Sequence, residues 1–403
     1  MKQALEGVKV ADFSWAVMGP IMAKYLADHG ATVVKVESSS RIDVMRTVVF
    51  YKDNIPGMNR NPVQASYNSN KYDASLNLND ARGIEVAKRL IAWSDVVLEA
   101  YAPGRMEKWG LGYDDLVKIK PDIIMLRGSL EGQTGPHSRG TGVGITFQAV
   151  AGFTNLVGWP DRPPTGMPNA YTDFVAPWYG IAAMVGALDY KRRTGKGLYI
   201  DLSQLEPGVS FLSPEVLDYT TNGRVQSRMG NSCSYAAPHA VYKCRGDERW
   251  CAISVFNDAE WKAFCQVIGN PAWTEDPKFA TLLGRKQNEE EINRLVEQWT
   301  IKHSAEEVME AMQKAGVAAG LTENGEDLHK DPQLKHRHHF WMLEHPEMGV
   351  TSYDGPPFRL SKTPAELHMH GPCVGEHNEY VYTQLLGMPD EEFIELLSEG
   401  VFD

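Results

Sequence analysis

The sequence predicts an α/β protein, with a doubly wound parallel sheet in a large domain and a second, smaller α+β domain. Strand-like and helix-like patterns alternate from the first residues to Asp201, which is typical of a parallel sheet with crossover helices. Beyond residue 222 alternating polar and apolar residues precede helical patterns, which indicates antiparallel strands in another core. A chain of 403 residues is long enough for two such cores.

The opening residues predict a βαβ unit. Residues 8–13 form a short apolar strand pattern, and an amphipathic run begins at Gly19 and Pro20 and ends at Gly30. Residues 32–37 form the next strand and finish with an acidic residue. Strand, helix and strand within about thirty residues match the size of a parallel crossover unit.

The alternation then continues along the large domain. We expect helices at 81–94, 113–119 and 173–193, and strands at 95–99, 123–126 and 200–202. Residues 128–152 are rich in glycine and polar residues, as irregular functional loops are. The long helix ends at a Thr-Gly-Lys-Gly sequence, residues 194–197.

The second half predicts the smaller domain and a return to the first. Residues 223–230 resemble a linker, 239–255 predict antiparallel strands, and helices follow at 259–268, 289–299 and 305–315. The remainder is rich in proline and extended until a last helix at 390–399. We therefore divide the chain into a large Rossmann-like domain over 1–222, a small domain over 223–325, and a C-terminal segment over 326–403 that returns to the large domain.

Composition restricts the partners. A net charge of −12 repels nucleic acid and anionic membrane surfaces, so neither is expected as a partner. The sequence shows no signal peptide and no apolar run of about twenty residues. The five cysteines form no CxxC pair, which suits reduced thiols and a cytoplasmic location.

The usual single motifs are missing. The sequence contains no GxGxxG after its first strand, no GxxxxGK[ST], no HExxH and no GxSxG, which disfavours dehydrogenases, phosphotransferases, zincins and serine hydrolases. Histidines cluster at 336–339 and at 368–370. Adjacent loop histidines rarely converge on one ion, and Arg337 opposes a cation, so we predict no metal.

An ordered series of short segments covers nearly the whole chain. It comprises LEGVKVADF from Leu5, LADHGA from Leu26, APG from Ala102, GQTGP from Gly132, YTD from Tyr171, RTGKG from Arg193, IDLSQ from Ile200, RMGN from Arg228, DPQL from Asp331 and GEH from Gly375. Taken together, these segments resemble the class III CoA-transferases, of the formyl-CoA transferase and carnitine CoA-transferase type. The resemblance implies an enzyme that moves coenzyme A between carboxylic acids, and an interlocked dimer.

Asp173 matches the family's catalytic aspartate. A carboxylate there can attack a thioester carbonyl and give an anhydride, then an aspartyl-CoA thioester. On the residues alone, the favoured role of Asp173 is to cap the helix that follows it, and the resemblance shifts the preference to catalysis. The two roles are compatible, because a helix N-terminus stabilises a carboxylate.

Three departures from the family concern the acyl pocket. Val17 stands where relatives carry a glutamine, and Val143 with Gly144 stand where they carry a tyrosine and an acid. The glycine-rich flap of formyl-CoA transferases is also missing between Asn231 and His239. The oxyanion donors are therefore unassigned, and the acyl pocket is expected to be roomier and more apolar.

The resemblance also marks residues for CoA itself. Phosphates call for basic side chains and backbone donors near the ends of the early strands. Candidates for the cofactor contacts are Val17 in the first turn, Lys71, Arg105, Lys108 and Arg41 as cations, and Ala100 and Tyr101 at the adenine. Solvated surface charge is the alternative for the cations, and ordinary core packing for Tyr101.

The substrates are predicted only by class. The texture resembles succinyl-CoA:benzylsuccinate transferases, so we expect succinyl-CoA as donor and an aromatic or dicarboxylic acid as acceptor. The aromatic residues Trp15, Trp159, Trp178 and Tyr179 could line that pocket. The enzyme is expected as a homodimer or with a related subunit.

Two alternative functions stay open. An α-methylacyl-CoA racemase would transfer a proton with a histidine and an aspartate, and His137 is its one obvious histidine in the 132–142 loop. The changes at Val17 and Val143 also allow a non-catalytic CoA-binding subunit.

Overall fold

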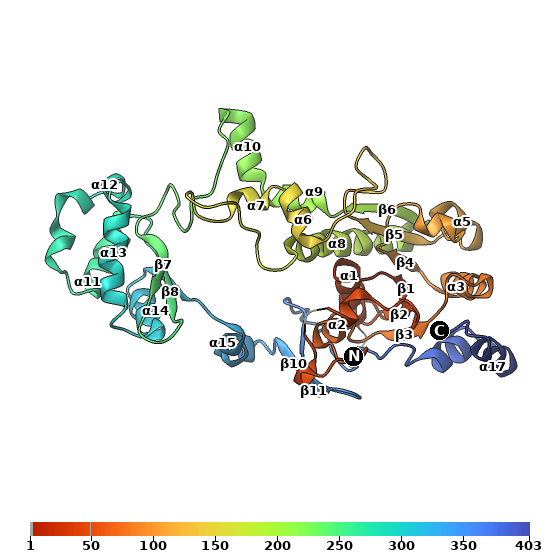
Figure 1. The fold of residues 1–403 in the computed structure, drawn as a ribbon. Helices are drawn as coiled ribbons and strands as arrows, with labels where there is room; N and C mark the ends of the chain where they lie inside the picture. Colours follow the sequence, from red (N-terminus) through yellow and green to blue (C-terminus); the bar gives the residue numbers. More distant parts are fainter. Residues whose placement is uncertain (1–2, 49) are drawn as a thin grey trace. The chain divides into compact units, whose positions relative to one another are not determined.

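A computed structural model describes residues 3–48 and 50–403, which form two compact units (Figure 1). Unit 1 contains the residues up to Thr154, Gly166–Val225 and Pro332–Asp403, and unit 2 contains Asn155–Thr165 and Gln226–Asp331. These boundaries differ from those expected at 222 and 325. Gly230 N donates to Gly158 O at 2.9 Å, which attaches the outlying segment. Arg249 bonds Asp327 at 2.7 Å, which attaches the residues before Asp331.

Unit 1 is built on a six-stranded, entirely parallel sheet with strand order β3-β2-β1-β4-β5-β6. The strands are β1 (Lys9–Phe13), β2 (Thr32–Glu37), β3 (Tyr72–Ser75), β4 (Val96–Glu99), β5 (Ile124–Ser129) and β6 (Leu198–Ser203). The order reverses between β1 and β4, which makes their carboxyl ends the switch point of the sheet. The predicted doubly wound parallel sheet is confirmed.

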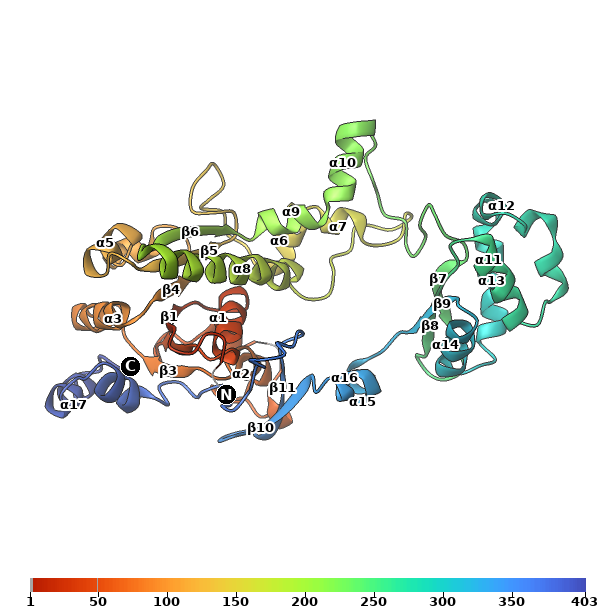
Figure 2. The ribbon, with the colours of Figure 1, turned by 180° about the vertical axis from the view of Figure 1, so that it is seen from behind.

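Helices cover both faces of this sheet (Figures 1 and 2). Side chains alternate along each strand, so Val96 and Val97 enter different cores. One core packs against α1 (Met18–Asp28) and α8 (Tyr171–Thr194). The other core packs against α3 (Ala81–Trp93), α5 (Tyr113–Ile119), η5 (Tyr380–Leu385) and α17 (Asp390–Ser398).

Shorter elements of unit 1 connect the layers. They are η1 (Val44–Arg46), η2 (Lys52–Asn54), α2 (Pro62–Tyr67), α4 (Arg105–Lys108), α6 (Gly144–Val150), α9 (Leu205–Phe211), α10 (Ser213–Asn222) and α16 (Pro332–His336). A hairpin of β10 (Phe340–His345) and β11 (Gly349–Asp354) precedes the last helices. The expected irregular region at 128–152 is therefore partly helical, because α6 forms within it.

The C-terminal residues return to the outer edge of the sheet at β3. Gly375 N donates to the Asp73 carboxylate at 2.7 Å, and Ser75 N donates to the Asn378 side chain at 2.7 Å. The Tyr382 hydroxyl donates to Ser75 O at 2.7 Å, and its ring stacks on Phe402 with centroids 4.2 Å apart. These contacts protect a strand edge that would otherwise be free to pair.

Unit 2 is an antiparallel sheet covered by helices. Its strands are β7 (His239–Lys243), β8 (Trp250–Ser254) and β9 (Ala318–Leu321), in that order. Its helices are α11 (Asp258–Val267), η3 (Ala272–Glu275), η4 (Pro277–Phe279), α12 (Leu282–Gln287), α13 (Glu289–Thr300), α14 (Ala305–Lys314) and α15 (Gly325–Lys330), and α7 (Phe153–Leu156) leads into its outlying segment. The smaller α+β domain is confirmed, whereas the interlocked dimer remains a prediction.

Candidate active site

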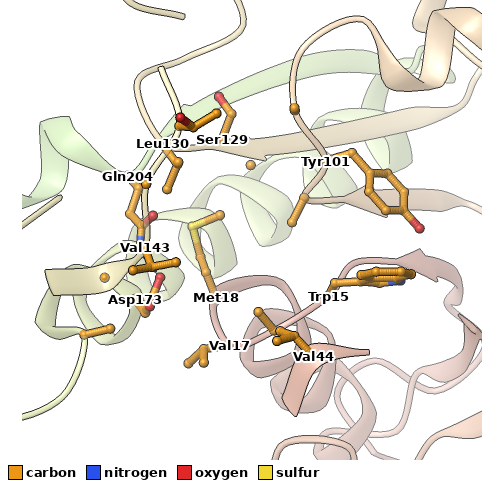
Figure 3. A pocket seen from close by; sticks show the side chains of 18 of the residues that line it. Trp15, Val17, Met18, Val44, Tyr101, Ser129, Leu130, Val143, Asp173 and Gln204 are labelled. Atoms are coloured by element: carbon orange, nitrogen blue, oxygen red, sulfur yellow. The ribbon is translucent and has the colours of Figure 1, made fainter. Parts of the chain in front are cut away.

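A cavity of about 570 Å³ lies in unit 1, at the carboxyl edge of the sheet (Figure 3). Its lining comes from the first βα turn at 15–18, the segment 44–48, the turn after β4 at 100–103 and the end of β5 at 128–130. Loop residues 138–144 and the first turn of α8 complete the lining. This position beside the β1/β4 switch point is where open α/β sheets bind ligands.

Asp173 lies in the first turn of α8 and its carboxylate enters the cavity. The N-cap residue of this helix is Ala170, and no side chain caps the helix. The capping alternative for Asp173 is therefore wrong. Its carboxylate oxygen Oδ1 instead accepts a hydrogen bond from the Gln204 side chain.

Burial raises the pKa of Asp173 to about 6, although the hydrogen bond from Gln204 acts in the opposite direction. Loss of water thus outweighs the stabilisation of the charged form by this hydrogen bond. At pH 7 a group with this pKa is still ionised by about ten to one. Asp173 is consequently a carboxylate that is charged near neutrality but poorly solvated, a combination that favours nucleophilic attack.

Gln204 is the site residue that sequence reasoning missed. It follows β6 directly, and its backbone N–H donates to Ser129 O at 2.8 Å. Ser129 pairs with Ser203 in the β5–β6 register, so the two strands carry Gln204 to the carboxyl edge. A polar residue immediately after a parallel strand is the signal that could have found it.

One wall of the cavity is apolar. It is formed by Val17, Met18, Val44, Met45 and Val48. Val17 is the N-cap residue of α1, so the first-turn position expected near the acyl group does face the cavity. The apolar wall thus consists of side chains from two separate segments, 17–18 and 44–48.

Loop residues 143 and 144 approach Asp173 from another side. Val143 lines the cavity and is 68% exposed. At Gly144 an added Cβ would overlap the side chain of Ala170 and lie 3.0 Å from Oδ2 of Asp173. Glycine therefore allows this loop to pack against the carboxylate.

Lys71 is buried and cannot serve as the predicted phosphate ligand in this arrangement. Its ammonium donates to Oδ2 of Asp12 at 3.0 Å, to Pro20 O at 2.9 Å and to Oδ1 of Asn68 at 2.9 Å. Burial lowers the pKa of Lys71 to about 8, and Asp12 partly offsets that change. All three ammonium donors are used, so the prediction for Lys71 is corrected to an internal anchor beneath α1.

Ala100 and Tyr101 line the cavity, as expected for a ligand contact. The Tyr101 ring meets Trp15 edge-on with centroids 5.7 Å apart and meets Trp109 at 5.3 Å. We call Trp15, Tyr101 and Trp109 the aromatic strip. The strip also borders a second, small cavity beside Glu37 and Ser38.

Two of the predicted cations flank this strip. The Arg41 guanidinium lies 5.3 Å from the Trp15 ring centre, and that of Arg105 lies 5.6 Å from the Trp109 ring centre. Arg41 also lines the small cavity. Lys108 is exposed at the end of α4 and lines neither of these two cavities.

The other aromatic candidates lie elsewhere. Trp178 and Tyr179 are 42% and 44% exposed on α8 and do not line the cavity. Trp159 belongs to unit 2, where it lines a separate cavity. Of the four residues considered, Trp15 alone borders the described site.

The histidines do not form a site with Asp173. His137 is exposed and does not line the cavity. In residues 3–48 and 50–403 no group of three or more His, Cys, Asp or Glu side chains is placed to hold a metal ion. Over the same residues, no helix is both long and apolar enough to cross a membrane.

Comparison with known proteins decides the family. The model of "CoA-transferase family III" matches residues 5–378. The chain belongs to this family. Succinyl-CoA–D-citramalate CoA-transferase of Chloroflexus aurantiacus is 31% identical over 398 residues, which cover 98% of each chain. Human succinyl-CoA:glutarate CoA-transferase is 29% identical over 399 residues, which cover 99% of this chain and 90% of the relative.

The fold agrees with this assignment. The crystal structure of a CAIB/BAIF family protein from Brucella suis superposes with a TM-score of 0.87 and 28% identity, covering 96% of this chain and all of that one. The class III CoA-transferase predicted from the ordered motifs is therefore confirmed, and it is an enzyme that acts on CoA thioesters. The benzylsuccinate specificity remains a prediction.

Proposed function

We propose that this CoA-transferase works through covalent intermediates on Asp173. A carboxylate oxygen attacks the acyl-CoA carbonyl, the C–S bond breaks, and CoA leaves as thiolate with a mixed anhydride behind it. The thiolate then attacks the Asp173 carbonyl carbon, which releases the first acid as carboxylate and leaves an aspartyl-CoA thioester. The acceptor carboxylate repeats both steps in reverse. No net proton is gained or lost, and the thioester energy is conserved.

The observation that carries this proposal is the placement of Asp173. It is the one carboxylate among the residues that line the described cavity, and this cavity is lined by the turns that follow β1 and β4 at the switch point of the sheet. Its neighbour Gln204 is neutral, so the carboxylate is not held in an ion pair that would weaken it as a nucleophile. Partial burial also limits the water that would hydrolyse an anhydride.

CoA is proposed to lie along the aromatic strip. The Tyr101 and Trp15 rings offer surfaces for adenine or the pantetheine arm, with Arg41 and Arg105 near enough to meet phosphates. Lys108 follows one turn after Arg105 and is exposed to solvent, so it can add charge for the same group. Arg41, Arg105 and Lys108 therefore supply a local positive charge that attracts the phosphates of CoA, although the net charge of the chain is −12.

For the acids, we propose succinyl-CoA as donor and an aromatic or dicarboxylic acid as acceptor. The names of the citramalate and glutarate relatives support the donor and the dicarboxylic class. The apolar wall suits the hydrocarbon part of an acyl group. Assembly as a homodimer or with a related subunit fits a further relative, the β subunit of succinyl-CoA–L-malate CoA-transferase, which is 31% identical over 403 residues.

Intact-mass measurement after rapid acid quench tests the nucleophile. Incubation of the wild type with succinyl-CoA should give a CoA adduct that peptide mapping assigns to Asp173. The adduct should be absent from Asp173→Asn and present in Asp189→Asn, a matched control on an exposed part of the same helix. Transfer activity in Asp173→Asn, or exchange of an α-proton with no adduct in the wild type, would overturn the proposal.

A further inference from the structure

The first βα turn contains a residue in an unfavourable backbone conformation. Ala16 has a φ of 62°, in the left-handed region that a residue with a Cβ rarely occupies. Such a conformation is strained and persists only where the surrounding contacts enforce it. Ala16 itself, with Trp15, Val17 and Met18, lines the cavity. The contacts that hold Ala16 in this conformation therefore also position the side chains of this turn that line the cavity.

The Asp43 carboxylate holds the turn. Ala16 N–H donates to Oδ1 and Oδ2 of Asp43 at 3.0 and 3.2 Å. The same Oδ1 accepts from Met45 N–H at 3.0 Å and so caps η1. The two segments that form the apolar wall are thus joined through one side chain, and Figure 3 shows Val17 and Val44 from these segments at the cavity.

Lys35 on β2 forms an ion pair with the Asp43 carboxylate. Its ammonium donates to Oδ2 of Asp43 at 3.2 Å and to Ser14 O at 3.0 Å, and it lies 3.6 Å from Glu37. Asp43 and Lys35 are fully buried. Burial alone would lower the pKa of Lys35, but the surrounding carboxylates, Glu37 foremost, outweigh it and raise the pKa, so the ammonium stays charged.

We propose that Asp43 and Lys35 are positioning residues of the transfer reaction. They keep the apolar wall of the cavity in a fixed position relative to the Asp173 carboxylate. The inference rests on the proposed role of Asp173 as nucleophile. An acyl carbonyl must stay within about 3–3.5 Å of the attacking oxygen, and a displacement of 1 Å can cost about 10²-fold in rate. A displaced wall also admits water, which diverts the anhydride to hydrolysis.

The decisive comparison is Asp43→Asn with Asp28→Asn. Asp28 is also fully buried and paired with a lysine, Lys24, but it lies at the far end of α1 and does not line the cavity. Two rates are measured per folded enzyme: transfer from succinyl-CoA to an acceptor acid, and thiol release without acceptor. Asp43→Asn should lower kcat/KM for transfer about tenfold and raise the ratio of hydrolysis to transfer about fivefold. Asp28→Asn should change both by less than about twofold.

Two further variants sharpen the test. Asp43→Ala removes every acceptor and should lower kcat/KM about 10²-fold. Ala16→Gly in the Asp43→Asn background should recover part of the loss, because glycine adopts a positive φ without strain. Equal effects of Asp43→Asn and Asp28→Asn, or an unchanged hydrolysis ratio in Asp43→Asn, would overturn the positioning role. Failure of the wild type to form an adduct on Asp173 would overturn the nucleophile instead, while both rates remain measurable.

Discussion

Replacing Asp173 by asparagine should stabilise the fold above pH 6. The pKa of Asp173 rises from an ordinary 3.8 to about 6 on burial, and each tenfold change in proton affinity corresponds to about 1.4 kcal/mol. Ionising this carboxylate therefore costs the folded state about 3 kcal/mol more than the unfolded chain. Asp173→Asn keeps an oxygen for the Gln204 hydrogen bond and removes the charge.

The pH dependence gives the sign of the effect. Below pH 3.8 the carboxyl is protonated in both states, and the cost vanishes. Between pH 3.8 and about 6 the cost grows, because the unfolded chain ionises first. Above pH 6 it is present in full. The free energy of unfolding of Asp173→Asn should therefore exceed that of the wild type by up to about 3 kcal/mol at pH 8 and by only about 0.5 kcal/mol at pH 4.

Scanning calorimetry of both proteins from pH 4 to 8 measures this difference. For a folding unit of about 290 residues, 3 kcal/mol corresponds to about 5 °C in the unit 1 transition. Asp189→Asn, which removes a carboxylate from ion pairs on the exposed side of α8, should give no such gain. A wild type as stable as Asp173→Asn at pH 8, or a difference that does not shrink below pH 6, refutes the reasoning.

Three further predictions concern neighbouring groups. Gln204→Leu removes the hydrogen bond that lowers the pKa of Asp173, so the acidic limb of the pH profile of kcat/KM should move from about pH 6 to higher pH. An acidic limb at the same pH in the variant would show that Gln204 does not lower the pKa of Asp173. Lys71→Met leaves a buried carboxylate unpaired and should lose about 3–5 kcal/mol in denaturant titrations, with KM for the CoA thioester unchanged. Arg105→Gln should raise that KM several-fold at low salt and less at high salt, and equal effects at both would argue against a phosphate contact.

Strong local patterns made much of the fold predictable. The continuous apolar runs of β1 and β2 were predictable because a parallel strand is buried on both faces, and the long helix that contains Asp173 was predictable from the Thr-Gly-Lys-Gly sequence that ends it. By contrast, β3 has the sequence Tyr-Asp-Ala-Ser, and β9 has Ala-Ala-Gly-Leu. Neither has a pattern of its own, since each is held in its sheet by partners distant in the chain.

The candidate site was likewise only partly predictable from the sequence. Asp173, Val17, Ala100 and Tyr101 were predicted because they match positions of the family that the sequence resembles, and all four line the cavity. Lys71 was assigned wrongly because a basic residue looks the same in sequence whether it meets a phosphate or an internal aspartate. Only the structure shows that the Lys71 ammonium pairs with Asp12, which lies 59 residues earlier in the chain.

The closure of the β3 edge has a consequence for synthesis of the protein. Tyr72–Ser75 leave the ribosome about 300 residues before the segment around Gly375 and Tyr382 that covers them. At about 5–20 residues per second, the edge waits about 15–60 s for its cover. During that time the nascent sheet exposes unpaired backbone groups to other chains, so binding by chaperones should matter most for this enzyme before its final helices are translated.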